Sequence, residues 1–109
     1  MCIAVRPDTS ITVANLRKAR ALIADPRHHL CGDFRRSERM CSLNALSLAL
    51  TGKDYVDITN SQEFHDIHRS LEFRLLNARG NICDRNNRSH AEAMANFDEA
   101  IFEASMAEH

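Results

Sequence analysis

Hydrophobic residues recur at helical spacing in two stretches of the first half of the chain. The first stretch follows the capping side chains of residues 8–10 and predicts a helix from about residue 10 to 25, ending before Pro26. The second predicted helix is capped by Ser37 and ends near residue 51, before Gly52. Apolar side chains cover much of its girth, so we expect it at the buried centre of the domain.

The second half of the chain continues the helical spacing. Asn60 followed by Glu63 resembles a capping box and opens a third predicted helix, which ends at Gly80. A full Ser-x-x-Glu capping box at Ser89 opens a fourth, which runs to about residue 106.

Short connections join the four predicted helices. Residues 27–36 and 81–88 have no apolar period and are predicted loops, and Tyr55, Val56 and Ile58 suggest one short extended piece. This pattern predicts an all-α fold, a compact four-helix bundle or an orthogonal helical array, within a single domain of residues 1–109.

Composition places the chain among ordinary globular proteins. It has 109 residues, of which 44% are hydrophobic and 27% charged, enough for one modest core. The net charge is −1, but residues 1–40 carry eight Arg and Lys against four Asp and Glu, whereas residues 41–109 carry six against eleven. This division either neutralises itself within the fold or leaves a basic face for an acidic partner.

The N-terminus and the cysteines indicate the compartment. Charge and Pro7 interrupt the opening residues before a secretion signal forms, and no apolar run is long enough to span a bilayer. We therefore expect a cytoplasmic protein with no membrane association. The four cysteines, at positions 2, 31, 41 and 83, form no Cys-x-x-Cys pair and are expected to be reduced.

Cys2 is the one candidate nucleophile. Removal of Met1 would expose it, and the opening Met-Cys-Ile-Ala-Val resembles the start of class II glutamine amidotransferase-like proteins, in which the terminal thiol attacks the substrate. That fold needs two stacked β-sheets and a longer chain, and this sequence has almost no strand pattern. We therefore expect no enzymatic activity.

His65 and His68 are the candidate metal ligands. Their spacing of three on the third predicted helix can place two imidazoles on one face. A metal site of this kind usually takes two further ligands, and the other His and Cys residues show no motif spacing. A partly buried core histidine is the competing interpretation, and we expect no cofactor.

Three arginines form the candidate anion site. Arg35, Arg36 and Arg39 fall at the predicted start of the second helix, where backbone N–H groups and guanidinium groups would together attract an anion. A solvated loop tip that pairs with the acidic fourth helix is the alternative. Nucleic-acid binding would be better supported by interleaved aromatic residues, and only Phe34 lies nearby.

Two further polar segments are candidate binding surfaces. The loop around Asp84 and Arg85 is dense in hydrogen-bonding groups, which suit either turn formation or recognition. The outer face of the fourth predicted helix is acidic, with Asp98, Glu99 and Glu103.

Three short motifs resemble a family of small helical bacterial and phage proteins classed only as a domain of unknown function. That family has a Leu-Arg-x-Ala-Arg helix ending in Asp-Pro, a Cys-x-x-Gly-Ala-Leu helix, a Trp-Asn-Asp loop and a Phe-Asp-x-Ala-Ile helix. The corresponding segments here are 16–20 with Asp25-Pro26, 41–46 with Asn44 in place of the glycine, and 97–101. The chain has no Trp, and residues 83–86 stand only loosely for the loop. The resemblance implies a helical fold and no particular activity.

The sequence therefore predicts a small interaction module of bacterial or phage origin. Its expected partner is another protein, such as a nucleic-acid-binding complex, and its expected role includes inhibition of a host defence system such as a CRISPR–Cas effector. A homodimer through the apolar excess of the second helix is also expected. The alternatives are a metal- or small-ligand-binding protein using His65 and His68, and a nucleic-acid binder using the basic N-terminal half.

Overall fold

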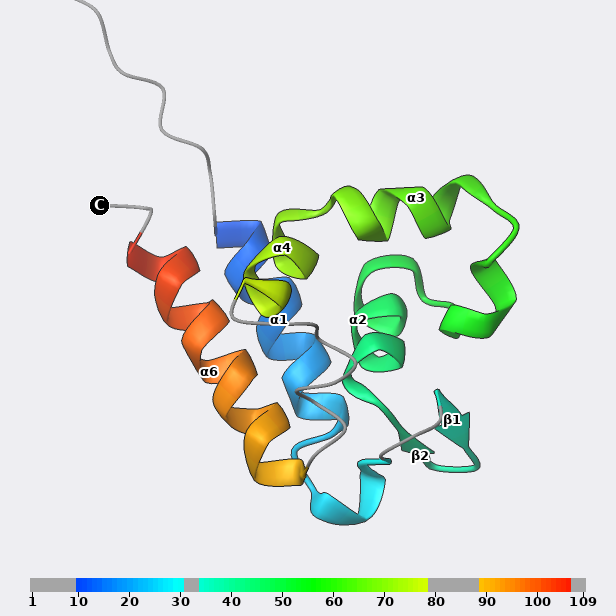
Figure 1. The fold of residues 1–109 in the computed structure, drawn as a ribbon, viewed down its shortest axis with the longest axis horizontal. Helices are drawn as coiled ribbons and strands as arrows, with labels where there is room; N and C mark the ends of the chain where they lie inside the picture. The colour runs from blue at the N-terminus through cyan, green and yellow to red at the C-terminus, as the bar shows by residue number, and fades with distance from the viewer. Residues whose placement is uncertain (1–9, 31–33, 79–88, 107–109) are drawn as a thin grey trace, which may run out of the picture.

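Helices make up nearly all the regular structure in the computed structural model, which describes residues 10–30, 34–78 and 89–106 (Figure 1). This confirms the predicted all-α class. The α-helices of these residues are α1 (Ser10–Leu22), α2 (Ser42–Thr51), α3 (Gln62–Arg69), α4 (Leu71–Asn77) and α6 (His90–Met106). Two 3₁₀ helices, η1 (Pro26–His28) and η2 (Tyr55–Ile58), and two short strands, β1 (Arg35–Arg36) and β2 (Arg39–Met40), complete the described elements.

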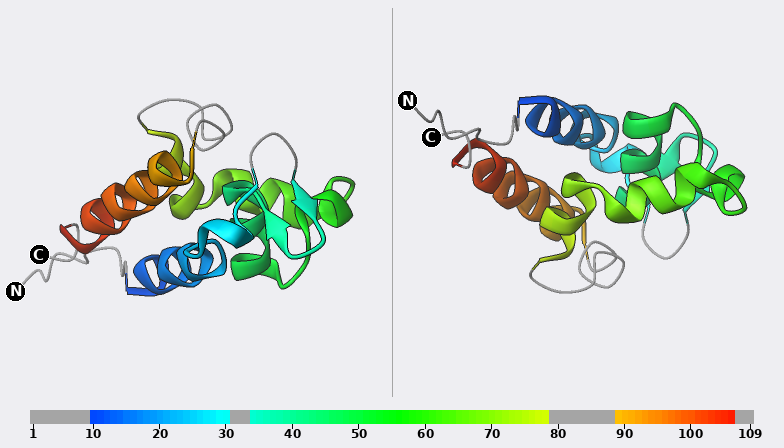
Figure 2. Two further views of the ribbon diagram at one scale, coloured as in Figure 1. Left: turned by 90° about the horizontal axis from the view of Figure 1, so that it is seen from below. Right: turned by 90° about the horizontal axis from the view of Figure 1, so that it is seen from above.

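The long helices α1 and α6 lie side by side and run in opposite directions, as the colours in Figure 1 show. Helix α2 packs against α1, and α4 packs against α6 and α1. Helix α3 contacts α2, α4 and η2. The β1–β2 hairpin lies at the end of the molecule away from α6 in both views of Figure 2.

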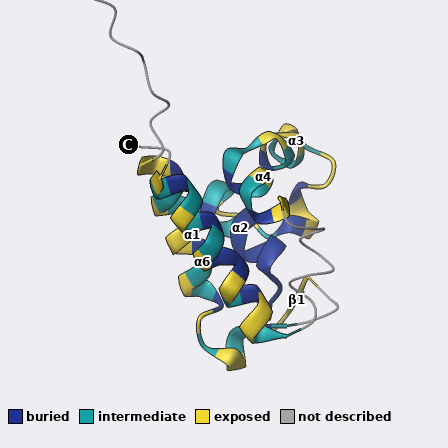
Figure 3. Ribbon diagram, turned by 60° about the vertical axis from the view of Figure 1, so that its left-hand side comes forward, coloured by how far each residue is buried: buried dark blue, intermediate teal, exposed yellow. Residues whose placement is uncertain are grey.

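Helix α2 is the buried centre, as its apolar girth predicts. Every residue from Ser42 to Ser47 is buried, and so is Ala49. In Figure 3 this helix is almost entirely dark blue, whereas exposed segments recur along its neighbours. The apolar excess of α2 was the reason to expect a homodimer. It no longer supports one, because the apolar side chains of this helix are buried or partly buried within one chain.

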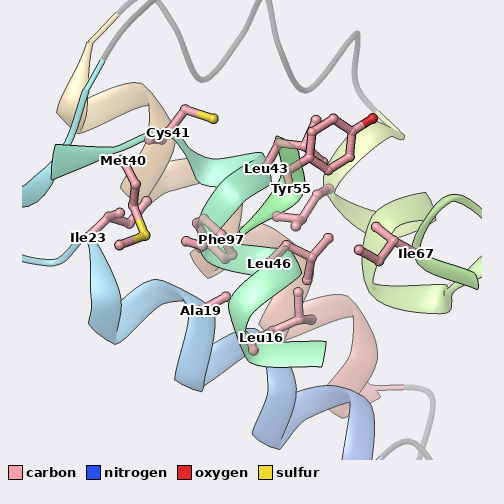
Figure 4. Close-up of a cluster of buried hydrophobic side chains, with 14 of the residues drawn as sticks. Leu16, Ala19, Ile23, Met40, Cys41, Leu43, Leu46, Tyr55, Ile67 and Phe97 are labelled. Carbon is pink, nitrogen blue, oxygen red and sulfur yellow. The ribbon is translucent and has the colours of Figure 1, made fainter. Parts of the chain in front are cut away.

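The core forms where α1, α2 and α6 meet. Leu16 and Ala19 of α1, Leu46 of α2 and Phe97 of α6 are fully buried, and Figure 4 shows them gathered between the helices. Burial of each large apolar side chain contributes about 2 kcal/mol to folding. Helix α6 confirms the fourth prediction, and the Ser89 hydroxyl accepts a hydrogen bond from the Glu92 N–H at 3.1 Å.

The prediction that Ser37 caps the second helix was wrong. Residues 35–40 form an antiparallel hairpin instead, with Ser37 at its turn in the left-handed region at φ 54°. Strand pairing holds the residues on either side of this turn, and it extends to a hydrogen bond from the Cys41 N–H to the Phe34 carbonyl at 2.9 Å. The helix can begin only at Ser42, once this pairing ends.

The third predicted helix is two helices, and Ser70 divides them. Its backbone is extended at ψ 151°, which interrupts the helical path. The Ser70 hydroxyl donates to the Ile67 carbonyl at 2.6 Å and accepts from the Phe73 N–H at 3.1 Å. One side chain thus ends α3 and caps α4. Helix α3 follows Ser61 rather than Asn60, and the predicted end at Gly80 lies outside the described residues.

Two smaller boundaries also differ from the prediction. Helix α1 ends at Leu22, three residues early, because Asp25 caps the separate turn η1 by accepting from the Arg27 N–H at 2.9 Å. The residues expected to be extended form η2, where Tyr55 and Ile58 are buried and Val56 is exposed.

Candidate functional site

The predicted arginine cluster lies on the hairpin of residues 34–40, which we call the arginine hairpin, and not at a helix N-terminus. Arg35 pairs with Met40 and Arg36 with Arg39 across the two strands. All residues from 34 to 39 are exposed. The anion site predicted at the start of a helix was therefore wrong in its geometry, although the three arginines do share one short structural unit.

The base of the arginine hairpin is fixed to the core. Met40 and Cys41 are buried, and the Leu30 N–H donates to the Met40 carbonyl at 2.9 Å. This bond adds to the one between Cys41 and Phe34, so the hairpin is held on both sides of its second strand. The backbone that carries the exposed arginines is therefore fixed to the core.

Arg35 links the hairpin to the segment after α2. Its Nη1 donates to Asp54 Oδ1 at 2.7 Å, and its Nε donates to the Ser37 carbonyl at 3.0 Å. Hydrogen bonds from Asn44 and from Arg35 hold the pKa of Asp54 below its usual range. The charge of Arg35 is thus compensated within the chain, and Arg36 and Arg39 are exposed on the same hairpin.

Asn44 is the residue that organises this region and that sequence reasoning did not single out. It is fully buried in α2, its Nδ2 donates to Asp54 Oδ1 at 2.9 Å, and its Oδ1 accepts from the Tyr55 N–H at 2.9 Å. A buried amide needs such partners, because an unsatisfied polar group costs about 1–3 kcal/mol. The signal was present in the sequence as a lone Asn among the apolar residues of a helix expected to be buried.

Tyr55 extends this network to the hairpin and to α3. Its ring lies 4.9 Å from that of Phe34, measured between ring centres, and its hydroxyl is hydrogen-bonded to His68 Nε2 at 2.9 Å. The centre of the His68 ring lies 4.5 Å from that of Phe64 and 4.8 Å from that of Phe73. Burial, and then the nearby His65, lower the pKa of His68 below its usual value.

The geometry of His65 and His68 does not favour a metal site. His68 directs Nε2 to the Tyr55 hydroxyl, while His65 sets its ring at a right angle to that of Phe64. Across the part of the chain that the structure describes, no three His, Cys, Asp or Glu side chains lie close enough to hold a metal ion. His68 is the partly buried core histidine of the competing interpretation.

Helix α6, which carries the acidic residues, lies away from the arginine hairpin (Figure 1). Asp98 accepts from Arg20 Nε at 2.9 Å, an ion pair that joins α6 to α1. The pair neutralises part of the charge difference between the two halves of the chain. Glu99 and Glu103 are half-buried on the same helix, and Asp84 and Arg85 lie outside the described residues.

Comparisons with known proteins identify a family. A model of the family of unknown function DUF6197 matches residues 8–103. The chain belongs to DUF6197. This membership confirms the predicted resemblance to a domain of unknown function. Neither the search of curated proteins nor that of solved structures returned a match.

Membership in DUF6197 supplies no activity, so function has to be argued from the site. Within residues 10–30, 34–78 and 89–106, no helix has both the length and the apolar composition needed to cross a bilayer. Of the four cysteines of this DUF6197 chain, only Cys41 is described, and it is buried in the core. Cys2 lies outside the described residues.

The role of Asn44 can be tested with Asn44→Ala. We expect the free energy of unfolding to fall by about 3 kcal/mol, because the Asp54 carboxylate and the Tyr55 N–H both lose a buried partner. Urea denaturation followed by circular dichroism measures the change. Asn60→Ala, at an exposed position, is the matched control and should shift the value by less than about 0.5 kcal/mol. Equal effects of the two substitutions would contradict the network.

The lowered pKa of His68 predicts the pH dependence of stability. The unfolded chain, with a histidine pKa of about 6.5, binds a proton more readily than the folded chain, so the free energy of unfolding should decrease as the pH falls from 7.5 to 5.5. His68→Gln, which cannot titrate, should flatten this slope in denaturation experiments across that range. His65→Gln keeps the buried imidazole and should retain most of the slope. An unchanged slope in His68→Gln would show that burial of this imidazole is not its source.

Proposed function

We propose that this chain is a small interaction module that binds an acidic partner protein through the arginine hairpin. The observation that supports the proposal is the register of Arg36 directly opposite Arg39. Like charges at opposite positions of an antiparallel pair repel each other and lower its stability. Both arginines are exposed, and a carboxylate of an acidic partner near the two guanidinium groups would offset part of this repulsion.

The turn of the hairpin has a second unfavourable feature. Ser37 adopts the left-handed conformation, which costs a residue other than glycine about 1 kcal/mol. Strained backbone clusters at ligand clamps and other functional sites, which supports a recognition role for this turn. The Arg35–Asp54 ion pair and the buried base hold this arrangement in place.

The side chains around the turn favour a protein partner. Guanidinium groups bind carboxylates with two parallel hydrogen bonds, and arginine and aromatic residues are enriched at protein interfaces. Phe34 lies beside the arginines with 38% of its surface exposed. An acidic protein surface can supply carboxylates for Arg36 and Arg39 and an apolar contact for Phe34. Inhibition of a defence system such as a CRISPR–Cas effector stays a prediction, as does bacterial or phage origin.

A pull-down with a charge-reversed hairpin tests the proposal. The tagged full chain is incubated with lysate of the organism that encodes it, with and without nuclease, and bound proteins are identified by mass spectrometry. We expect a stoichiometric protein that resists nuclease, and its recovery should fall at least about tenfold with Arg36→Glu/Arg39→Glu. Arg69→Glu/Arg74→Glu makes the same charge change at exposed positions of α3 and α4 and should leave recovery unchanged.

Three results would count against the proposal. Recovery of nucleic acid alone, with an affinity that falls steeply with salt, would favour the nucleic-acid alternative. Capture that survives reversal of the hairpin charge would place the binding surface elsewhere. Equal loss with both double variants would mean that net charge matters rather than the hairpin.

A further inference from the structure

The outer face of α6 carries two large apolar side chains that stay exposed among the residues that the structure describes. Phe102 has 65% of its surface exposed and Met106 has 56%. Helical periodicity places both on the side opposite the buried residues Ala93, Phe97, Ala100 and Ala104. Ala91 and Ala95 are exposed on the same side, about two to four turns closer to the N-terminus of the helix.

The order of large and small residues on this face is self-complementary. Small side chains occupy its first half, at Ala91 and Ala95, and large ones its second half, at Phe102 and Met106. If a second α6 runs in the opposite direction, Phe102 of each copy faces Ala95 of the other, and Met106 faces Ala91. The same register satisfies both pairs, as an interface with twofold symmetry requires. We propose that a second copy of this chain packs antiparallel against this face.

A groove beside the face can receive the phenyl ring of Phe102. The groove runs between α1 and α6, has a volume of about 440 Å³, and is lined by Arg17, Arg20, Ala21, Ala24, Asp98 and Ile101. Its small side chains are Ala21, near the end of α1, and Ala24, which follows that helix. Its α6 residues, Asp98 and Ile101, lie near the middle of α6. The proposed register places Phe102 of the second copy opposite Ala95, one turn before Asp98 and therefore at the edge of this groove.

The charges on the face fit a second copy as well. The twofold axis brings Asp98 of both copies close together, which would be unfavourable for two uncompensated carboxylates. Arg20 already pairs with Asp98 within each chain at 2.9 Å. Arg17 is exposed in the same groove, and no described residue forms an ion pair with it. Arg17 can therefore reach Asp98 of the second copy, so that each carboxylate meets two guanidinium groups.

This interface is separate from the arginine hairpin, which lies at the opposite end of the molecule in Figures 1 and 2. A dimer through α6 leaves both hairpins exposed. It would present two equivalent binding sites and increase the apparent affinity for a partner with repeated acidic sites. The dimer does not depend on the proposed function, because its test measures mass alone.

Sedimentation equilibrium of the full chain over a series of concentrations tests the dimer. We expect the wild-type chain to dimerise and Phe102→Asp to weaken the association about 100-fold, because it places a charge against Ala95. Val56→Asp is the matched control: Val56 is an equally exposed hydrophobic residue, at 59%, but lies on η2. It should dimerise like the wild type. Circular dichroism confirms that each variant is folded.

A size swap tests the register. Ala95→Phe adds apolar surface at an exposed position, yet we expect it to weaken the dimer, because two large rings then face each other. The double variant Ala95→Phe/Phe102→Ala restores a large residue opposite a small one and should recover dimerisation. A wild-type chain that stays monomeric at every concentration overturns the proposal. So does an Ala95→Phe variant that associates as strongly as the wild type, or a Val56→Asp variant as weak as Phe102→Asp.

Discussion

Helix α2 is covered by protein on nearly every side, so water cannot reach its buried polar side chains. A side-chain amide buried in such a helix must find its hydrogen-bond partners inside the protein. Helix α2 meets this constraint through Asn44, whose side chain bonds to the Asp54 carboxylate and the Tyr55 backbone. Ser47 does the same one turn later, by donating to the Lys53 carbonyl at 2.7 Å. These bonds hold residues 53–55, which follow α2, against the side of that helix.

The remaining features of the site follow from this turn. With Asp54 held by Asn44, Arg35 has a fixed carboxylate to bind, and the first strand of the arginine hairpin is anchored. With Tyr55 held by its backbone, its ring supports Phe34 and its hydroxyl meets His68 of α3. One buried amide thus helps to position both the arginine hairpin and α3 through the same tyrosine. The helix pair α1–α6 lies outside this network, which allows a separate interface there.

Sequence reasoning succeeded where local signals and burial agree. The capping box at Ser89 and the apolar repeat behind it predicted α6, and the apolar girth of α2 predicted its place at the centre. It failed where tertiary contacts decide the local structure. Ser37 looks like a helix cap, but the bonds of Phe34 with Cys41 and of Leu30 with Met40 commit the neighbouring residues to a hairpin. Ser70 sits inside a continuous apolar repeat, and its capping role depends on a backbone angle that no pattern reveals.

The sequence predicted which residues belong to the site but not which residues they contact. Three arginines close together in sequence were recognised, but the ion pair between Arg35 and Asp54, nineteen residues away, was not. The histidine pair was recognised, but the partner of His68 is a tyrosine thirteen residues away, and the bond between them excludes His68 Nε2 from a metal. The acidic helix was recognised, but its Asp98 is paired with Arg20 of the first helix. In each case the missing information was a contact between distant segments.

Hydrogen exchange of the Tyr55 backbone amide, followed by nuclear magnetic resonance, tests the central role of Asn44 most directly. Tyr55 begins a short 3₁₀ helix, where amides usually exchange quickly, and its N–H donates to the Asn44 side chain. If Asn44 holds this segment to the core, the Tyr55 amide should exchange only through global unfolding, with the same free energy as the amides in the centre of α2. Exchange of the Tyr55 amide several kcal/mol more easily than those α2 amides would contradict the account.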